Sequence, residues 1–227
     1  MKFSSALTSL PIMFDPIFVF LLLVLAVACG RRILGLLRAP VSNLTRLEYG
    51  SLSGALGLGA LQMAPFALGC AGLLNRGAIL AVLGLLAVVL ASDIRAVLRV
   101  GASALRRPAW PRGWMLAGCL IVAAALGVLL LRCLCPPTDI DGLYYHLAAP
   151  KRWLQSGSLG YVPTLLQTNM PMGAEMLYTI ALALWTDTAA KLIHFAFGAL
   201  SLLAIFALGR RVRCDALGFA AAGLWLF

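Results

Sequence analysis

Charged residues are scarce in this sequence: they make up 11% of the 227 residues, and only eight are Asp or Glu. A soluble domain carries about 25% charged residues, so the composition excludes a water-soluble enzyme, a disordered tail and a disulfide-stapled secreted module. Short alternating strands are also missing, which argues against a transmembrane barrel. Hydrophobic residues make up 62% of the chain and form long unbroken runs. The sequence therefore predicts an all-α fold, a polytopic helical membrane protein.

Metal-ligand spacing is missing as well. Cys133-Leu134-Cys135 is not a CxxC pair, and no histidines stand at zinc spacing from it. The two histidines, His146 and His194, lie far apart in the sequence. We therefore predict no metal site, although a divalent cation as cofactor is left open. His194 falls inside an apolar run, where we expect it to hydrogen-bond a neighbouring helix.

Six apolar runs approach the ~20 residues that a helix needs to cross a bilayer. They cover residues 11–29, 49–74, 77–91, 113–131, 173–185 and 189–208. A seventh run begins at Ala216 and is still apolar at Phe227, where its residues would reach only about 18 Å as a helix. We therefore expect six to seven transmembrane helices, the last one incomplete. This pattern suggests the N-terminal part of a longer protein, which need not be active alone.

The net charge of +10 comes from short basic clusters between the apolar runs, which is typical of topology signals and not of nucleic-acid binding. If all six runs cross once, ten of the 18 Lys and Arg fall on one side and eight on the other. This balance places the loop of residues 132–172 outside the cytoplasm. The cluster Arg210-Arg211-Val212-Arg213 contradicts it. Either this cluster is an exception, or the run after Pro171 does not cross fully.

Glycines are dense in the second run, at Gly50, Gly54, Gly57 and Gly59. Small residues at such spacing allow helix backbones to approach closely in lipid. We expect these glycines to serve packing within the chain more than a dimer interface; the oligomeric state itself is left open.

The loop of residues 132–172 concentrates ionisable and aromatic side chains. Pro136-Pro137 ends the fourth run, Thr138 or Asp139 can cap a new helix, and Gly157 can end it. The apolar side chains of this helix fall largely on one face: Leu143, Leu147, Trp153 and Leu154. The pattern predicts a helix that lies on the membrane surface.

Three motifs of this region resemble the first exoplasmic loop of the GT-C glycosyltransferases: Asp-Gly-Leu-Tyr-Tyr-His-Leu (141–147), Trp-Leu-Gln-Ser-Gly (153–157) and Asn-Met-Pro-Met-Gly (169–173). These integral-membrane enzymes use polyprenyl-phosphate sugars and include the protein O-mannosyltransferases and the aminoarabinose transferases. The similarity covers residues 113–227, which would be the start of a GT-C-like core with the exoplasmic catalytic loop. Residues 1–112 would form three preceding transmembrane helices with cytoplasmic loops.

The resemblance implies a glycosyltransferase of the bacterial inner membrane. It would transfer a hexose or pentose from a polyprenyl-phosphate donor, with the catalytic loop facing the periplasm or exterior. In the family, an acidic residue at the start of the loop, shortly before a tyrosine, is the catalytic base. Asp141, followed by Tyr145, matches this position, and Asp139 is the second candidate. Such a carboxylate deprotonates or orients the acceptor hydroxyl; alone, either aspartate could simply cap a helix.

The leaving phosphate needs cations or hydrogen-bond donors. The substrate-binding candidates are Tyr144, Tyr145, His146, Lys151 and Arg152. Aminoarabinose transferases carry an arginine and a lysine near the lipid phosphate where this chain has Tyr144 and Met170. For Glu175 we favour pairing with a basic side chain over a second acidic role. A transporter or permease subunit and a non-catalytic structural membrane protein are the alternatives, but transporters place ionisable residues at mid-membrane rather than in a surface loop.

Overall fold

A computed structural model of the chain describes residues 14–106, 113–212 and 215–226, and these residues form helices and no β-strand. The ends of the first and seventh predicted runs, at residues 11–13 and 227, lie outside the described residues. The elements are α1 (Asp15–Leu36), α2 (Arg46–Leu61), α3 (Met63–Cys70), α4 (Arg76–Val89), α5 (Ala91–Arg106), α6 (Trp114–Leu134), the π-helical segment η3 (Gly142–His146), α7 (Ala148–Ser156), the short 3₁₀ segment η4 (Leu166–Asn169), α8 (Gly173–Leu184), α9 (Asp187–Arg211) and α10 (Asp215–Leu226).

Polar caps define where several of these helices begin. Thr45 and Glu48 form a reciprocal capping box at α2, and Thr186 accepts a hydrogen bond from the backbone N–H of Ala189 at the start of α9. Gly157, with a φ of 73°, ends α7 in the left-handed region, as the sequence predicts.

Four helices are long and apolar enough to cross a membrane: α1, the continuous α2–α3 segment, α6 and α9. The pair α4 and α5 would make a fifth span, although it bends by 73° at Leu90. The α8 and α10 helices have 12 residues each. The described residues thus confirm an all-helical protein with four or five candidate spans and do not confirm the expected six to seven.

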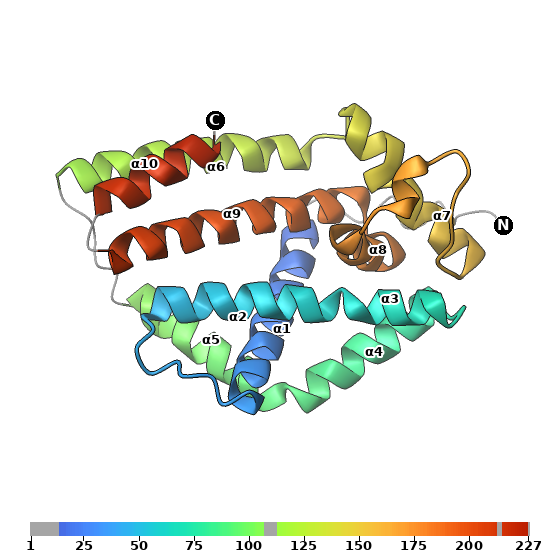
Figure 1. The fold of residues 1–227 in the computed structure, drawn as a ribbon, viewed down its shortest axis with the longest axis horizontal. Coiled ribbons are helices and arrows are strands. Elements are labelled where there is room, and N and C mark those ends of the chain that lie inside the picture. The colour runs from blue at the N-terminus through green and yellow to red at the C-terminus, as the bar shows by residue number, and fades with distance from the viewer. Residues whose placement is uncertain (1–13, 107–112, 213–214, 227) are drawn as a thin grey trace.

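Helices α2, α3, α6, α9 and α10 run along the long axis of the molecule, whereas α1 crosses behind α2 at a steep angle (Figure 1). The α9 helix packs between α2 and the pair of α6 and α10. No residue of α6 is buried, whereas α8 is buried on most of its surface, from Glu175 to Ala181. The α8 helix packs against α9, α7, α3, α4 and α2 and is largely enclosed by protein. With 12 residues it is not among the candidate spans, so the expected crossing of the fifth apolar run is not confirmed.

Helices α1 and α2 approach each other through small residues. A Cβ atom built on Gly57 would overlap the backbone carbonyl of Ala26, and one built on Gly30 would overlap that of Ser53. Gly54 faces Leu200 of α9, while Gly59 has no neighbouring atom within 4 Å. Two of the four glycines of the second run, Gly54 and Gly57, thus pack against another helix of the chain, whereas Gly50 and Gly59 do not.

The segments η3, α7 and η4 gather at one end of the molecule, which we call the loop end (Figure 1). Hydrogen bonds from the Leu74 N–H to the Gly157 carbonyl and from the Leu159 N–H to the Gly69 carbonyl connect this loop to the end of α3. A helix is present where the sequence predicts one, but it is divided into η3 and α7. Trp153 is buried in it and donates to the Gly160 carbonyl, whereas Leu143 is exposed.

Candidate functional site

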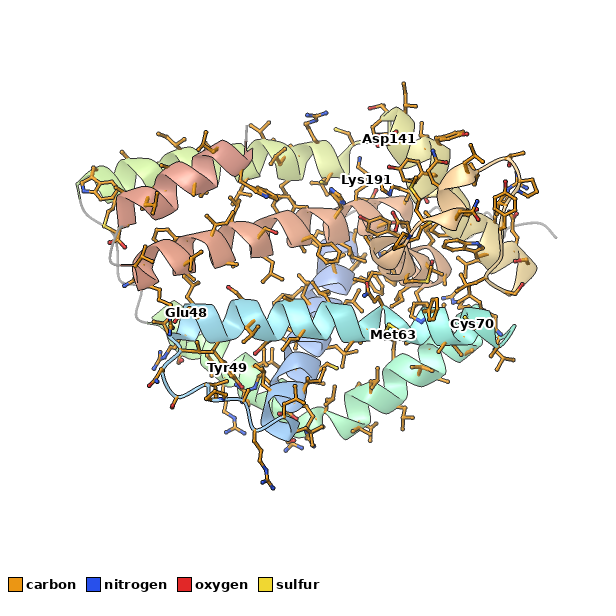
Figure 2. The ribbon with its side chains drawn as sticks, in the orientation of Figure 1. Glu48, Tyr49, Met63, Cys70, Asp141 and Lys191 are labelled. Atoms are coloured by element: carbon orange, nitrogen blue, oxygen red, sulfur yellow. The ribbon has the colours of Figure 1, made fainter. Side chains whose placement is uncertain are left out.

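Two aspartates of the loop face a cavity of about 280 Å³, which we call the aspartate pocket. Its charged and polar lining comes from Asp139, Asp141, His146, Tyr178, Lys191 and His194. The first three belong to the loop, Tyr178 to α8 and the last two to the first turns of α9. Figure 2 shows Asp141 and Lys191 together at the loop end, with Glu48 at the opposite end. The pocket therefore unites carboxylates, imidazoles and an ammonium group in one small space.

The two aspartates have different surroundings. Asp139 Oδ2 accepts a hydrogen bond of 2.6 Å from the backbone N–H of Gly142, and so it caps the start of η3. Asp141 is exposed and makes no capping hydrogen bond. The capping interpretation thus fits Asp139, whereas no hydrogen bond among the described residues occupies the Asp141 carboxylate.

His146 pairs with Glu175 across the loop end. Its Nδ1 lies 2.5 Å from Glu175 Oε1, and the Glu175 side chain is almost fully buried. Behind this pair, the hydroxyl of Tyr178 lies 2.6 Å from His194 Nδ1. Both expectations from the sequence hold here: Glu175 pairs with a basic group, and His194 bonds a neighbouring helix.

The two loop tyrosines diverge. The ring of Tyr145 packs on His146 with 4.0 Å between centroids, and it is half-buried. Desolvation at this position, together with the negative charges of Asp141 and Glu175, raises the pKa of Tyr145 above its ordinary value. Its phenol therefore stays protonated near neutral pH. Tyr144 is exposed, and its hydroxyl donates to the Thr164 carbonyl at 3.3 Å, away from the pocket.

Lys151 and Arg152, the cations predicted to bind the donor phosphate, do not line the aspartate pocket. Lys151 Nζ lies 2.7 Å from Asp187 Oδ2 and so joins α7 to the start of α9. Arg152 is exposed on α7. The structure therefore assigns Lys151 a partner within the chain and leaves Arg152 outside the cavity.

Two other cations, Arg132 and Lys191, line the cavities at this end of the molecule. A second cavity of about 860 Å³ adjoins the first and shares Asp139, Lys191 and His194 with it. Arg132 lines its polar end, and α6 and α9 supply apolar walls that include Leu126, Leu129 and Phe195. Lys191 Nζ donates to the carbonyls of Arg132 and Cys135, which fastens the start of α9 to the end of α6. The combined cavity is thus charged at the loop end and apolar between the two helices.

Sequence analysis did not identify Lys191, Arg132 or Tyr178 as site residues. Lys191 could have been noticed as a single cation in the first two turns of an apolar run, and Arg132 as a cation directly after one. Their proximity depends on how α6 and α9 pack, over 50 residues apart in the chain. Within the described part of the chain, no group of three or more His, Cys, Asp or Glu could hold a metal ion.

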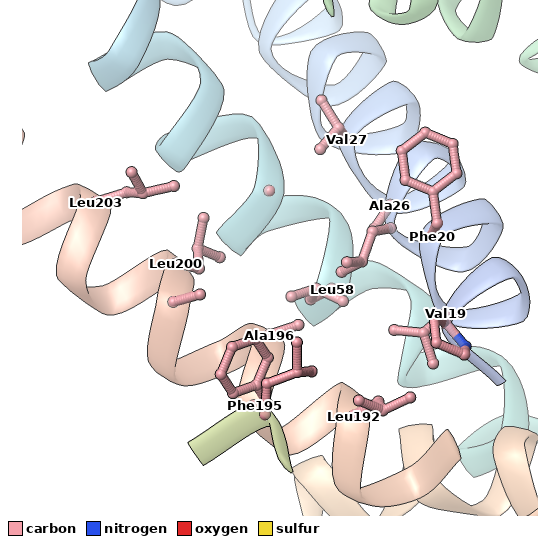
Figure 3. A pocket seen from close by; sticks show the side chains of 15 residues that line it. Val19, Phe20, Ala26, Val27, Leu58, Leu192, Phe195, Ala196, Leu200 and Leu203 are labelled. Atoms are coloured by element: carbon pink, nitrogen blue, oxygen red, sulfur yellow. The ribbon is translucent and has the colours of Figure 1, made fainter. Parts of the chain in front are cut away.

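A further cavity of about 360 Å³ lies between α1, α2 and α9 (Figure 3). Its lining is apolar, with Phe20, Leu58 and Phe195 among the side chains that face it. Such a surface offers no group for binding or transferring a sugar, so the chemistry of the described residues concentrates at the loop end.

The fold and site define a class, an all-helical protein with several helices capable of spanning a membrane and a polar pocket at one end of the bundle. Comparison with known proteins adds no family: the chain matches no protein-family model, no curated protein and no solved structure.

Proposed function

We propose that this protein is a membrane glycosyltransferase of the GT-C type, which transfers a sugar from a polyprenyl-phosphate donor to an acceptor on the exoplasmic side. The observation that carries the proposal is the combined cavity, in which two aspartates and two cations lie at the polar end of an apolar cleft between α6 and α9. A lipid-linked sugar phosphate is likewise divided into a polar head and a long apolar tail, which match the polar end and the apolar walls of the cavity.

Each part of the cavity has a counterpart in the reaction. The polyprenyl chain lies along the apolar walls of α6 and α9, and Arg132 and Lys191 stabilise the phosphate as negative charge develops on it. Asp141 orients the acceptor hydroxyl and takes its proton. Asp139 mainly holds the backbone of η3, which keeps Asp141 at the pocket.

Binding of the donor lipid tests this proposal directly. In lipid nanodiscs, we expect the protein to bind undecaprenyl phosphate at least about tenfold more tightly than undecaprenol, because a charge-assisted hydrogen bond contributes about 1.5–3 kcal/mol. Arg132→Gln should remove most of that preference. Arg76→Gln is the matched control, since Arg76 is an exposed arginine at the start of α4 that lines neither cavity. Equal binding of the two lipids by the wild-type protein would contradict the proposal.

The short α8 helix supports one orientation of the protein in the membrane. Arg211 at the end of α9 lies 3.0 Å from Glu48 at the start of α2, so these two helix ends share one side. If α8 does not cross, 12 of the 18 Lys and Arg fall on that side, in place of the ten counted when every run crosses. They are Arg31, Arg32, Arg38, Arg46, Arg95, Arg99, Arg106, Arg107, Arg112, Arg210, Arg211 and Arg213. This stronger bias favours a cytoplasmic location for that side and an exoplasmic location for the loop end.

Cysteine labelling measures this orientation. In a variant without the native cysteines, Ser158→Cys at the loop end should react with a membrane-impermeant maleimide added to intact cells. Ser103→Cys in α5 and Arg211→Cys should react only after the membrane is permeabilised. The reverse pattern would invert the proposed topology, and labelling of Arg211→Cys from outside would show that α8 crosses.

The transporter alternative has one observation in its favour, the bend between α4 and α5, because transporters use broken helices. Near that bend, however, Asp93 is paired with Arg32 at 2.6 Å, and Ser92 accepts a hydrogen bond from the same arginine. The cavity in the middle of the bundle is apolar (Figure 3). The polar groups available to a ligand lie at the loop end, which favours transfer chemistry over transport.

A further inference from the structure

The pairing of His146 with Glu175 fixes which imidazole nitrogen is available. Glu175 is 5% exposed, and a buried carboxylate is costly unless a donor satisfies it. The contact of 2.5 Å between Glu175 Oε1 and His146 Nδ1 supplies that donor, so Nδ1 carries the hydrogen. In the neutral ring, Nε2 is then the basic nitrogen.

His146 lies in the pocket that also contains Asp141. About a third of its side chain is exposed. Among the described residues, the hydrogen bond of the ring is the one to Glu175. The rings of Tyr145 and Tyr178 pack beside it, at 4.0 Å and 6.3 Å between centroids, and restrain its orientation. The geometry is that of a carboxylate–imidazole pair that presents a base to a cavity.

Building on the proposed function, we propose that His146 is the second proton acceptor of the aspartate pocket, after Asp141, and that Glu175 is its positioning residue. In the transfer step, the acceptor oxygen bonds to the anomeric carbon. The bond between that carbon and the phosphate oxygen breaks, and its electron pair leaves with the polyprenyl phosphate. The hydroxyl proton moves to the Asp141 carboxylate and from there to His146 Nε2, from which water removes it.

The second transfer returns the site to its starting state. Asp141 and His146 line the same pocket, and passing the proton from Asp141 to His146 regenerates the carboxylate for the next acceptor. Glu175 stabilises the imidazolium that results, as the buried carboxylate does in a Ser-His-Asp triad.

The pair can be tested without sugar transfer, through the reactivity of Nε2. Diethyl pyrocarbonate acylates an unprotonated imidazole nitrogen. Trypsin cleaves after Lys151 and Lys191, which lie between His146 and His194, so the two histidines can be measured in separate peptides. At pH 8, Glu175→Gln should slow acylation of His146 at least about fivefold, because the amide can donate to Nδ1 and so place the hydrogen on Nε2. In Glu175→Asp, which keeps the carboxylate, His146 should be acylated at a rate between those of the wild-type protein and Glu175→Gln.

Glu48→Gln is the matched control, since it removes a carboxylate at the opposite end of the molecule. It should leave the labelling rate of His146 unchanged. Size-exclusion profiles and Tm values of each variant show whether it folds, and Glu175→Asp keeps the test open if Glu175→Gln does not. Equal labelling of His146 in folded wild-type and Glu175 variants would overturn the inference, as would a wild-type His146 that does not react.

A second arm separates this inference from the proposed function. If the wild-type protein transfers sugar, His146→Ala should lower the rate, and added imidazole should restore at least about a tenth of it, an effect that a purely structural role would not produce. Lack of rescue in a folded His146→Ala protein overturns the relay. If labelling depends on Glu175 but no polyprenyl-phosphate donor supports sugar transfer, the proposed function and the proton transfer through His146 are both refuted. Only the pairing of His146 with Glu175 is then retained.

Discussion

Replacing Asp141 by asparagine is expected to lower sugar transfer by about 100- to 10,000-fold, the usual contribution of a positioned general base. Asp141 lines the aspartate pocket without a capping hydrogen bond, so its carboxylate stabilises no local structure that the substitution would disturb. The Tm should therefore change little. The measurement is the initial rate of transfer from a radiolabelled polyprenyl-phosphate sugar by wild-type and variant protein at matched concentrations.

Asp139→Asn is the matched control for this prediction. Asparagine caps a helix about as well as aspartate, so the hydrogen bond to the Gly142 N–H should survive and transfer should fall by less than about tenfold. Unimpaired transfer by folded Asp141→Asn, with a large loss in Asp139→Asn, would exchange the roles of the two aspartates. Unimpaired transfer by both variants would remove the carboxylate chemistry from the proposal.

The helical pattern of this chain could be predicted because it depends on local sequence. The apolar runs, the proline pair at residues 136–137 and Gly157 indicate where helices begin and end. The pairing of Glu175 was also predictable, because a lone acidic residue beside an apolar run needs a donor. Its partner was not, since His146 lies 29 residues away and meets Glu175 only when α7 packs on α8.

Long-range packing accounts for the features that the sequence did not reveal. An apolar run of about 13 residues suits a buried helix as well as a transmembrane one, and the five helices that pack against α8 are not visible in the run itself. The bend between α4 and α5 occurs at Leu90, where neither proline nor glycine marks it. Likewise, Lys151 was a plausible phosphate ligand until Asp187 was found beside it, and Lys191 became a better candidate through its place on α9.

The contact between α1 and α2 carries the second large prediction. A methyl group added by Gly57→Ala would overlap the backbone carbonyl of Ala26, and backbone atoms cannot move aside as a flexible side chain can. The two helices would have to separate, which would also loosen the neighbouring contact of Gly30 with Ser53. We expect Gly57→Ala to lower the free energy of unfolding by about 3 kcal/mol or more, at the upper end of the cost of overpacking a core. The Tm should then fall by roughly 6 to 12 °C.

Gly59→Ala makes the interpretation of this result unambiguous. It is the same substitution in the same helix, two residues further on, at a glycine with no neighbouring atom within 4 Å. Alanine exceeds glycine in helix propensity by about 1 kcal/mol, so Gly59→Ala should leave the Tm unchanged or raise it. The measurement is thermal unfolding of the two variants in the same detergent. The Tm of Gly57→Ala should fall, and that of Gly59→Ala should stay the same or rise. Equal shifts would show that α1 and α2 do not pack through Gly57, because helix propensity would then account for both.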